Sequence, residues 1–290
     1  MSNSYSRTRP SLRTFDGGAF QRVVSVGVWA IVLFSVAAFA FIITSAFKSS
    51  GAILRSPWSL PESLHFENWV KAWTDGNLGV GFLNSVVLVV AASLTTTVIA
   101  APAAYALSRR GGRFANATLV YFVLGLGIPM QIIVLPLYSV LLGLGLINSL
   151  PGLFILYVVV NLPFTVFLLT GFFRSLPSEL EDAAALDGLT PNRTFWTIML
   201  PLARGGLTTA VLLNAINVWN ETFLALMFIQ TNDNYTLPLA ILNYFQQQQY
   251  SGSDYGALFA AASISILPMI VLYAWFGRRL TIGITSGALK

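Results

Sequence analysis

The chain has 290 residues, of which 56% are hydrophobic and only 9% are charged, with a formal net charge of +5. Soluble globular domains carry about 25% charged residues, so this composition excludes an ordinary soluble domain and indicates an integral membrane protein. The basic residues are dispersed along the chain, which argues against nucleic-acid binding. The absence of cysteine excludes disulfides, thiolate metal sites and thiol nucleophiles, and we expect no metal site and no catalytic residue.

Charge-free apolar runs recur along the sequence, and each is long enough for a helix to cross a bilayer, which takes about 20 residues. The runs are continuously apolar rather than alternating, which favours helices over barrel strands. The first run is too long for the apolar part of a cleaved signal peptide, so we expect it to be retained. We predict an all-α integral membrane protein with a transmembrane domain over 23–277 and six spans near 23–47, 80–107, 116–141, 150–171, 206–229 and 255–276.

Lysine and arginine predict which side of the membrane each connection faces. If both ends are cytoplasmic, Lys48, Arg55 and Lys71 are the three basic residues outside, and the other 13 of the 16 lie inside. This asymmetry follows the positive-inside rule. We therefore expect cytoplasmic tails over 1–22 and 278–290, in a multi-pass protein of a bacterial cell membrane.

Two longer segments are predicted on the outer side. The segment 48–79 contains three tryptophans, which favour the membrane interface, and its stretch "ESLHFENWVKAW" predicts a short surface helix. His65, the only histidine, is expected to be solvated or interfacial. The segment 231–254 is polar, and we predict a solvated loop there in preference to a docking surface.

The third predicted span contains Gly125, Gly127, Pro129 and Pro136. Proline removes a backbone donor and bends helices, and neighbouring helices in a membrane can satisfy the freed carbonyls. We predict a bend in this span, which could serve either a cavity or close packing.

The predicted cytoplasmic connection 174–204 is unusually acidic, and it contains several residues that are typical of helix starts and ends. Ser178 and Glu181 have the spacing of a capping box, alanines follow, and Gly188 is placed to end the helix in a left-handed turn. Thr190 and Pro191 then predict the start of a second helix, which Pro201 interrupts. The expected product is a short helix, a tight turn and a second helix on the inner face.

A helix this short is marginal in water, so it needs a surface to pack on. Four carboxylates fall within nine residues, at Glu179, Glu181, Asp182 and Asp187, and anionic lipid would repel them. Docking to another protein is therefore favoured over a connector lying on the lipid. The alanines would allow close approach, and Leu180 could anchor the helix.

The same stretch resembles the EAA loop of ABC-importer permeases. That pattern is EAA, three residues, Gly, nine residues, Ile, any residue, Leu-Pro, and here Asp182 replaces its glutamate while Glu181 lies one place earlier. Residues 135–188, 219–226 and 280–290 are similar to the carbohydrate-uptake, maltose-type branch. The resemblance implies that the ATPase-coupling residues are Glu181, Asp182, Ala183, Ala184, Asp187, Gly188, Ile198, Leu200 and Pro201.

The resemblance also implies the other components of the machine. ATP and Mg would be bound by two cytoplasmic ATPase subunits, and this chain would bind no cofactor. A sister permease would complete a heterodimer, and an extracytoplasmic solute-binding protein would deliver a sugar or oligosaccharide. The coupling helix of the EAA loop, between spans four and five, would act as the lever that switches the permeases between inward-facing and outward-facing states.

Polar residues inside the fifth predicted span are candidates for the translocation path. Asn214, Asn217 and Glu221 recur on one helical face, with Trp219 and Asn220 beside them. Amides and an aromatic ring suit neutral sugars, but such groups also join helices to each other. Asn84, Gln131, Tyr138 and Asn161 are weaker candidates of the same kind.

Two other readings of the chain stay open at this point. A self-contained secondary transporter would couple to protons through Glu221, the only ionisable residue placed within a span. A structural scaffold would have no need of the EAA spacing. The sequence does not identify the cargo.

Overall fold

The computed structural model describes residues 18–288, so most of the predicted tail over 1–22 lies outside the described residues. Every regular element in the described part is a helix. The helices longer than ten residues are α1 (Gly18–Ser45), α4 (Leu78–Arg109), α5 (Arg113–Leu126), α6 (Met130–Gly143), α7 (Leu150–Ser175), α11 (Arg204–Asn220), α13 (Leu237–Ser251) and α14 (Tyr255–Ala288). The shorter ones are α2 (Ser50–Arg55), α3 (Glu67–Asp75), α8 (Glu179–Leu186), α9 (Pro191–Thr194), the π-helix η1 (Phe195–Met199), α10 (Leu200–Leu202), α12 (Phe223–Phe228) and the 3-10 helix η2 (Asn232–Asn234).

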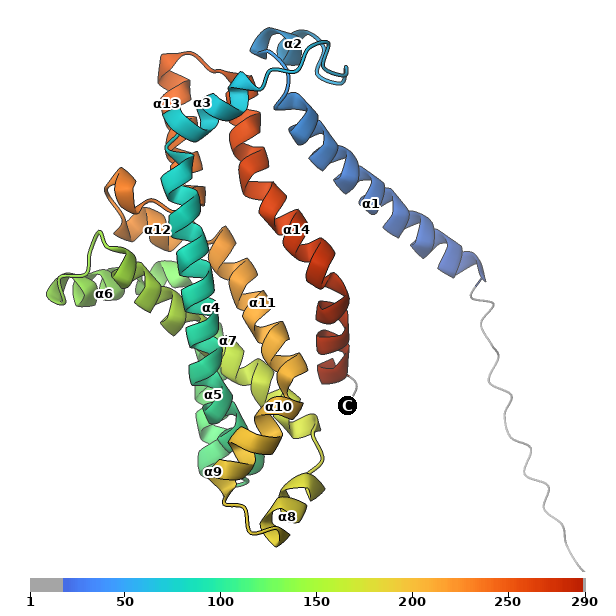
Figure 1. Cartoon of the computed structure of the whole chain (residues 1–290), viewed down its shortest axis with the longest axis vertical. Coiled ribbons are helices and arrows are strands. Elements are labelled where there is room, and N and C mark those ends of the chain that lie inside the picture. The colour runs from blue at the N-terminus through green and yellow to red at the C-terminus, as the bar shows by residue number, and fades with distance from the viewer. Residues whose placement is uncertain (1–17, 289–290) are drawn as a thin grey trace, which may run out of the picture.

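The centre of the molecule is formed by α4, α7 and α11, with α14 alongside α11 (Figure 1). Helix α4 buries mostly small side chains, among them Ala92, Ser93, Ala100 and Ala104. Small residues let helix backbones approach closely in a membrane, where apolar side chains gain little from meeting each other rather than lipid. The composition of α4 therefore explains why it is the helix around which the others gather.

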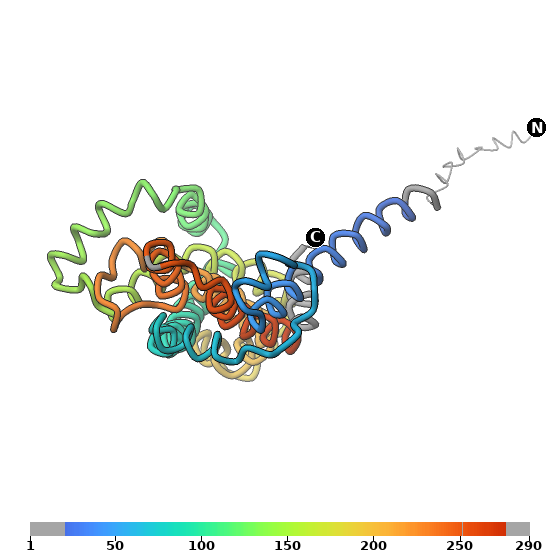
Figure 2. Tube along the Cα trace, turned by 90° about the horizontal axis from the view of Figure 1, so that it is seen from above, coloured from blue at the N-terminus to red at the C-terminus, as the bar shows by residue number. Residues whose placement is uncertain are grey.

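Four helices are long and apolar enough to cross a membrane by themselves, within residues 21–45, 78–109, 150–175 and 255–276. Two further helix pairs meet the same test only as bent units, α5 with α6 at 100° and the segment Pro191–Leu202 with α11 at 72°. Six spans remain a prediction, which this count allows if each bent pair is one span. Figure 2 shows α6 and α1 leaving the body on opposite sides.

The bend expected in the third span is present. Helix α5 ends at Leu126, Gly127 follows, and Pro129 stands directly before α6. Proline cannot donate a backbone hydrogen bond, so the helix restarts there in a new direction. The bend turns α6 to a new direction, and Leu141 of α6 remains buried in the same cluster as Leu153 and Phe228.

The outer segments differ from expectation in one case and agree in the other. The short helix expected within "ESLHFENWVKAW" is present as α3, which begins at Glu67 and ends at Asp75. The prediction of a solvated loop over 231–254 is wrong, because most of this segment forms α13. Leu237, Ala240 and Tyr244 of α13 are buried against Ala257 and its neighbours in α14.

The fifth predicted span is not one continuous helix over 206–229. Helix α11 ends at Asn220, and the short helix α12 begins at Phe223. Between them Glu221 has extended backbone, with φ −72° and ψ 123°. Glu221 therefore lies at a break between two helices rather than within one continuous helix.

Candidate functional site

The acidic connection forms a compact structure, here called the coupling loop (residues 176–203), at the end of the molecule where α4, α7 and α11 meet (Figure 1). Helix α8 ends as the sequence predicts. Gly188 has φ +79°, and the amide of Leu189 donates to the carbonyl of Ala184 at 2.9 Å. Glycine adopts this left-handed conformation without the steric penalty that a Cβ brings.

Gly188→Ala should weaken the coupling loop through backbone strain alone, because nothing lies within 4 Å of the Cβ that would be added. A left-handed non-glycine residue costs about 1–2 kcal/mol, and asparagine costs less than alanine. We expect faster protease cleavage in the coupling loop of Gly188→Ala than of Gly188→Asn, with the unmodified chain slowest. Equal cleavage of all three would contradict a role for the turn in holding α8.

The capping box predicted at the start of α8 is not formed. Ser178 has helical backbone angles, φ −70° and ψ −23°, and its side chain makes no cap hydrogen bond. A capping serine needs extended backbone for its hydroxyl to reach the following amides. The carboxylate of Glu181 pairs with Arg109 of α4 instead.

The second helix of the coupling loop begins as expected and then departs from a regular α-helix. Thr190 caps α9 by accepting from the amide of Arg193 at 3.4 Å. The residues that follow, Phe195 to Met199, form one turn of π-helix before Pro201, and the chain then bends into α11. Turns of π-helix are rare and occur often at functional sites.

The predicted coupling residues divide into an exposed and an internal group. Asp182, Ala183, Asp187, Gly188 and Pro201 are exposed, whereas Glu181, Ile198 and Leu200 are half-buried. Ala184 is buried within the chain itself, so a bulky residue there would disturb the loop before it touched a partner.

One exposed residue of α8 was missed by the sequence reasoning. Leu186 is 90% exposed, against 36% for Leu180, the anchor expected from the sequence. The available signal was its position after three alanines and directly before Asp187, at the end of the helix. The exposed surface of residues 179–187 thus combines three carboxylates, Glu179, Asp182 and Asp187, with the large apolar side chain of Leu186.

The inner side of the coupling loop is fastened to α4 and α7. The Nε of Arg109 lies 2.6 Å from Oε1 of Glu181, and its Nη2 donates to the carbonyl of Leu176 at 3.1 Å. The ring of Tyr105 lies 5.0 Å from that of Phe195 and 5.5 Å from that of Phe173, measured between centroids. Both polar and aromatic contacts therefore hold the coupling loop against α4 and α7.

Three polar contacts join α7 to α11 and to Glu221, which directly follows α11. Asn214 donates to Thr165 Oγ1 at 3.0 Å, and Asn217 donates to Asn161 at 3.5 Å. The Tyr157 hydroxyl donates to the carboxylate of Glu221 at 2.9 Å. Paired polar groups of this kind hold helices in register within a membrane.

Glu221 also caps α12, because its carboxylate accepts from the amides of Leu224 at 2.7 Å and Ala225 at 3.2 Å. With the Tyr157 hydroxyl, three donors converge on this one carboxylate. Through these three hydrogen bonds Glu221 links α7 to the start of α12, which is a structural role.

The remaining path candidates fall on different sides of α11. Trp219 is buried, donates to the carbonyl of Ser265 in α14 at 3.2 Å, and meets the ring of Phe82 edge-on. Asn214 is fully buried, whereas Asn217 and Asn220 are exposed. In this structure Trp219 and Asn214 join helices, whereas Asn217 and Asn220 have exposed side chains, and Asn217 also contacts Asn161.

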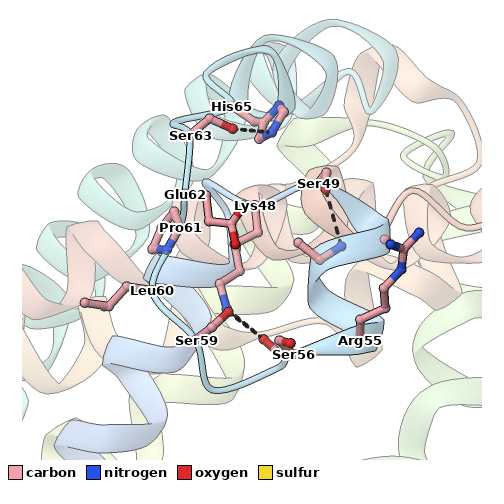
Figure 3. Close-up of a pocket in the computed structure, with 12 residues that line it drawn as sticks. Lys48, Ser49, Arg55, Ser56, Ser59, Leu60, Pro61, Glu62, Ser63 and His65 are labelled. Carbon is pink, nitrogen blue, oxygen red and sulfur yellow. Dashed lines mark hydrogen bonds between the residues drawn. The ribbon is translucent and has the colours of Figure 1, made fainter.

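The outer segment also contains a cavity of about 320 Å³ beside Lys48, Arg55 and His65 (Figure 3). Lys48 is buried, and its ammonium donates to the carbonyls of Ser56 and Pro57 at 3.2 and 2.9 Å. His65 lies at the rim, with Nδ1 2.7 Å from the carboxylate of Glu67, and this hydrogen bond lowers the pKa of Glu67. These contacts organise the segment that follows α1.

Comparison with known proteins gives the chain its family. Residues 93–284 match the family described as "Binding-protein-dependent transport system inner membrane component". The chain is 38% identical to the diacetylchitobiose uptake system permease protein NgcG of Streptomyces coelicolor, over 91% of this chain and 86% of that protein. It is 32% identical to the trehalose transport system permease protein SugB of Mycobacterium tuberculosis, over 80% and 84%.

The fold has a counterpart among solved structures. A bacterial ABC transporter involved in the import of the acidic polysaccharide alginate contains a chain that matches with a TM-score of 0.76 and 21% identity, over 96% of this chain and 99% of that one. At this identity the likeness supports the fold alone. The match to the family over most of the chain, with the two relatives, shows that the protein belongs to the inner-membrane components of binding-protein-dependent transport systems.

Proposed function

We propose that the chain is the permease subunit of an ATP-driven ABC importer, and that it forms part of the path for a sugar or oligosaccharide. The observation that carries this proposal is the coupling loop, in which α8 exposes Asp182, Leu186 and Asp187 while its other side is fastened to α4. The relatives named for diacetylchitobiose uptake and trehalose transport support a sugar as the cargo.

Docking of a cytoplasmic ATPase subunit on α8 is favoured by the physical character of the helix. An eight-residue helix is too short to be stable alone, and an exposed leucine side chain is stabilised by about 1.5–3 kcal/mol when a partner buries it. The carboxylates around Leu186 would select a basic rim on that partner. ATP and Mg would be bound there, and this chain would supply the lever.

The other partners complete the transport path. Asn217 and Asn220 lie on a side of α11 that this chain leaves exposed, so a sister permease packed against that side would enclose them. Two ATPase subunits would serve the two permeases, one on each coupling loop. An external solute-binding protein would deliver the sugar to the opposite end, near α2, α3 and α13.

Asn217→Leu and Asn220→Leu should each lower sugar uptake about three- to tenfold without loss of the assembled complex. Each change removes an amide able to bond a sugar hydroxyl, a contact worth about 0.5–1.5 kcal/mol, and keeps a side chain of similar size. Asn116→Leu, at an exposed asparagine of α5, is the matched control. Uptake unchanged by both α11 substitutions would remove these residues from the path.

Isolation in mild detergent tests the proposal as a whole. The chain, expressed with its native partners, should copurify with a second permease and an ATPase, identified by mass spectrometry. A chain that purifies alone and nevertheless transports solute would favour an ion-coupled carrier.

A further inference from the structure

The contact between Arg109 and Glu181 joins two elements that are 72 residues apart in sequence. Both side chains are half-buried, with 19% and 22% of their surfaces exposed. A buried ion pair is costly to break on one side only, since the remaining charge is left without a partner. Arg109 also donates to the carbonyl of Leu176, so one guanidinium holds the start of the coupling loop and α8 together.

The same end of α4 supports the second half of the coupling loop. Tyr105, one turn before Arg109, lies against the ring of Phe195 in the π-helix. Ala100 and Ala104 are buried in the same cluster as Met199. Helix α4 therefore contacts the coupling loop both before and after the turn at Gly188.

At its other end α4 holds the segment that leads into α13. The amide of Asn84 donates to the carbonyls of Asp233 and Tyr235, each at 2.9 Å. The hydroxyl of Ser85 accepts from the amide of Leu237, the first residue of α13, at 2.8 Å. Both ends of α4 thus have specific polar attachments to segments that are distant in sequence.

Helix α4 is long enough to connect the two sides of the membrane without a break. Its 32 residues extend about 48 Å at 1.5 Å per residue, which exceeds the hydrocarbon thickness of about 30 Å. Figure 1 shows it running from α3 and α13 at one end to α9 at the other. A continuous helix attached at both ends transmits displacement along its length.

We infer that Arg109 is a positioning residue that makes α4 move together with the coupling loop, so that a displacement of α8 reaches the outer segment 232–237. The inference rests on the proposed function. It also divides the two neighbouring carboxylates: Glu181 is the internal attachment, and Asp182 faces the ATPase subunit.

The test compares Arg109→Gln and Glu181→Gln in the complete complex of permeases, ATPase subunits and solute-binding protein. We expect the ATPase subunits to remain bound and to hydrolyse ATP, and the number of sugar molecules imported per ATP to fall about tenfold, which corresponds to about 1.4 kcal/mol of lost coupling. The double variant Arg109→Glu with Glu181→Arg should recover part of the loss. Arg110→Gln, at the exposed neighbour, is the matched control and should behave as the unmodified chain.

A distance measurement separates coupling from general damage. The chain has no cysteine, so Ala185→Cys and Arg110→Cys would place two spin labels, one on the exposed side of α8 and one at the end of α4. We expect one narrow distance distribution with and without ATP, and a broader one when Arg109→Gln is added. A distribution that stays equally narrow in Arg109→Gln would overturn the inference.

The transport results have equally definite consequences. Unchanged import per ATP in Arg109→Gln would overturn the inference, as would loss of the ATPase subunits from Glu181→Gln alone, which would make Glu181 a direct contact. An unmodified chain that retains no ATPase subunit would instead refute the proposed function.

Discussion

Leu186→Glu should release the ATPase subunit from the purified complex while the membrane helices remain folded. Leu186 is 90% exposed at the end of α8, so it contributes nothing to the packing of this chain. Burying leucine in a partner's groove is worth about 1.5–3 kcal/mol, and a glutamate would add the cost of an unpaired buried charge. We expect binding to weaken at least about thirtyfold, which corresponds to about 2 kcal/mol.

The control for this experiment is Leu64→Glu. Leu64 is 60% exposed in the outer segment, far along the chain from the coupling loop, so the same chemical change should leave copurification intact. Both variants should elute as the unmodified chain does in detergent. Retention of the ATPase subunit by Leu186→Glu at normal stoichiometry would show that α8 does not dock through this side.

Replacement of Glu221 should separate a structural carboxylate from a proton carrier. Glu221→Ala leaves the Tyr157 hydroxyl and the amides of Leu224 and Ala225 without their acceptor. Unsatisfied buried groups cost about 1–3 kcal/mol each, so the thermal midpoint in detergent should fall and the amount of folded chain should drop. Glu221→Gln keeps the shape and an acceptor oxygen, and should lose only about 1 kcal/mol.

Uptake by the Glu221→Gln protein that remains folded should be within about twofold of normal, since this loss of stability is small compared with typical folding free energies. A glutamine side chain does not titrate at physiological pH, so a carrier that couples to protons through residue 221 would be inactive. Complete loss of uptake in a well-folded Glu221→Gln chain would restore the ion-coupled alternative.

The elements that could be predicted were those whose signals are local. Long charge-free runs predict helices because lipid leaves the backbone no other way to satisfy its polar groups within one segment. Gly188 predicts a helix end because its left-handed turn suits glycine, and Pro129 predicts a bend because it lacks an amide. These predictions did not depend on which helices pack against each other.

Helix α13 was missed although its sequence contained the signal. Leu237, Ala240 and Tyr244 recur at helical spacing and form its buried side. The run of glutamines that follows lowers the mean hydropathy of the segment, which conceals a helix that buries only one stripe. A search for periodicity rather than for hydropathy would have found it.

The contacts within the candidate site could not be predicted from local sequence signals. Nothing near Glu181 in the sequence points to Arg109, and that pairing removed the expected capping box. Likewise the mixture of polar and apolar residues in α11 does not reveal which of its sides faces α14, so Trp219 and Asn217 could not be assigned to packing and to an open face from the sequence. Such assignments depend on the tertiary packing of several helices.

Reconstitution into sealed vesicles tests the central claim most directly. Vesicles should hold this chain, its sister permease and the ATPase subunits with ATP on the ATPase side, and receive the solute-binding protein and labelled oligosaccharides outside. We predict accumulation that requires ATP and the coupling loop with Leu186 intact, and that persists when a protonophore collapses the proton gradient. Accumulation against a gradient by this chain alone, or its abolition by the protonophore, would contradict the account.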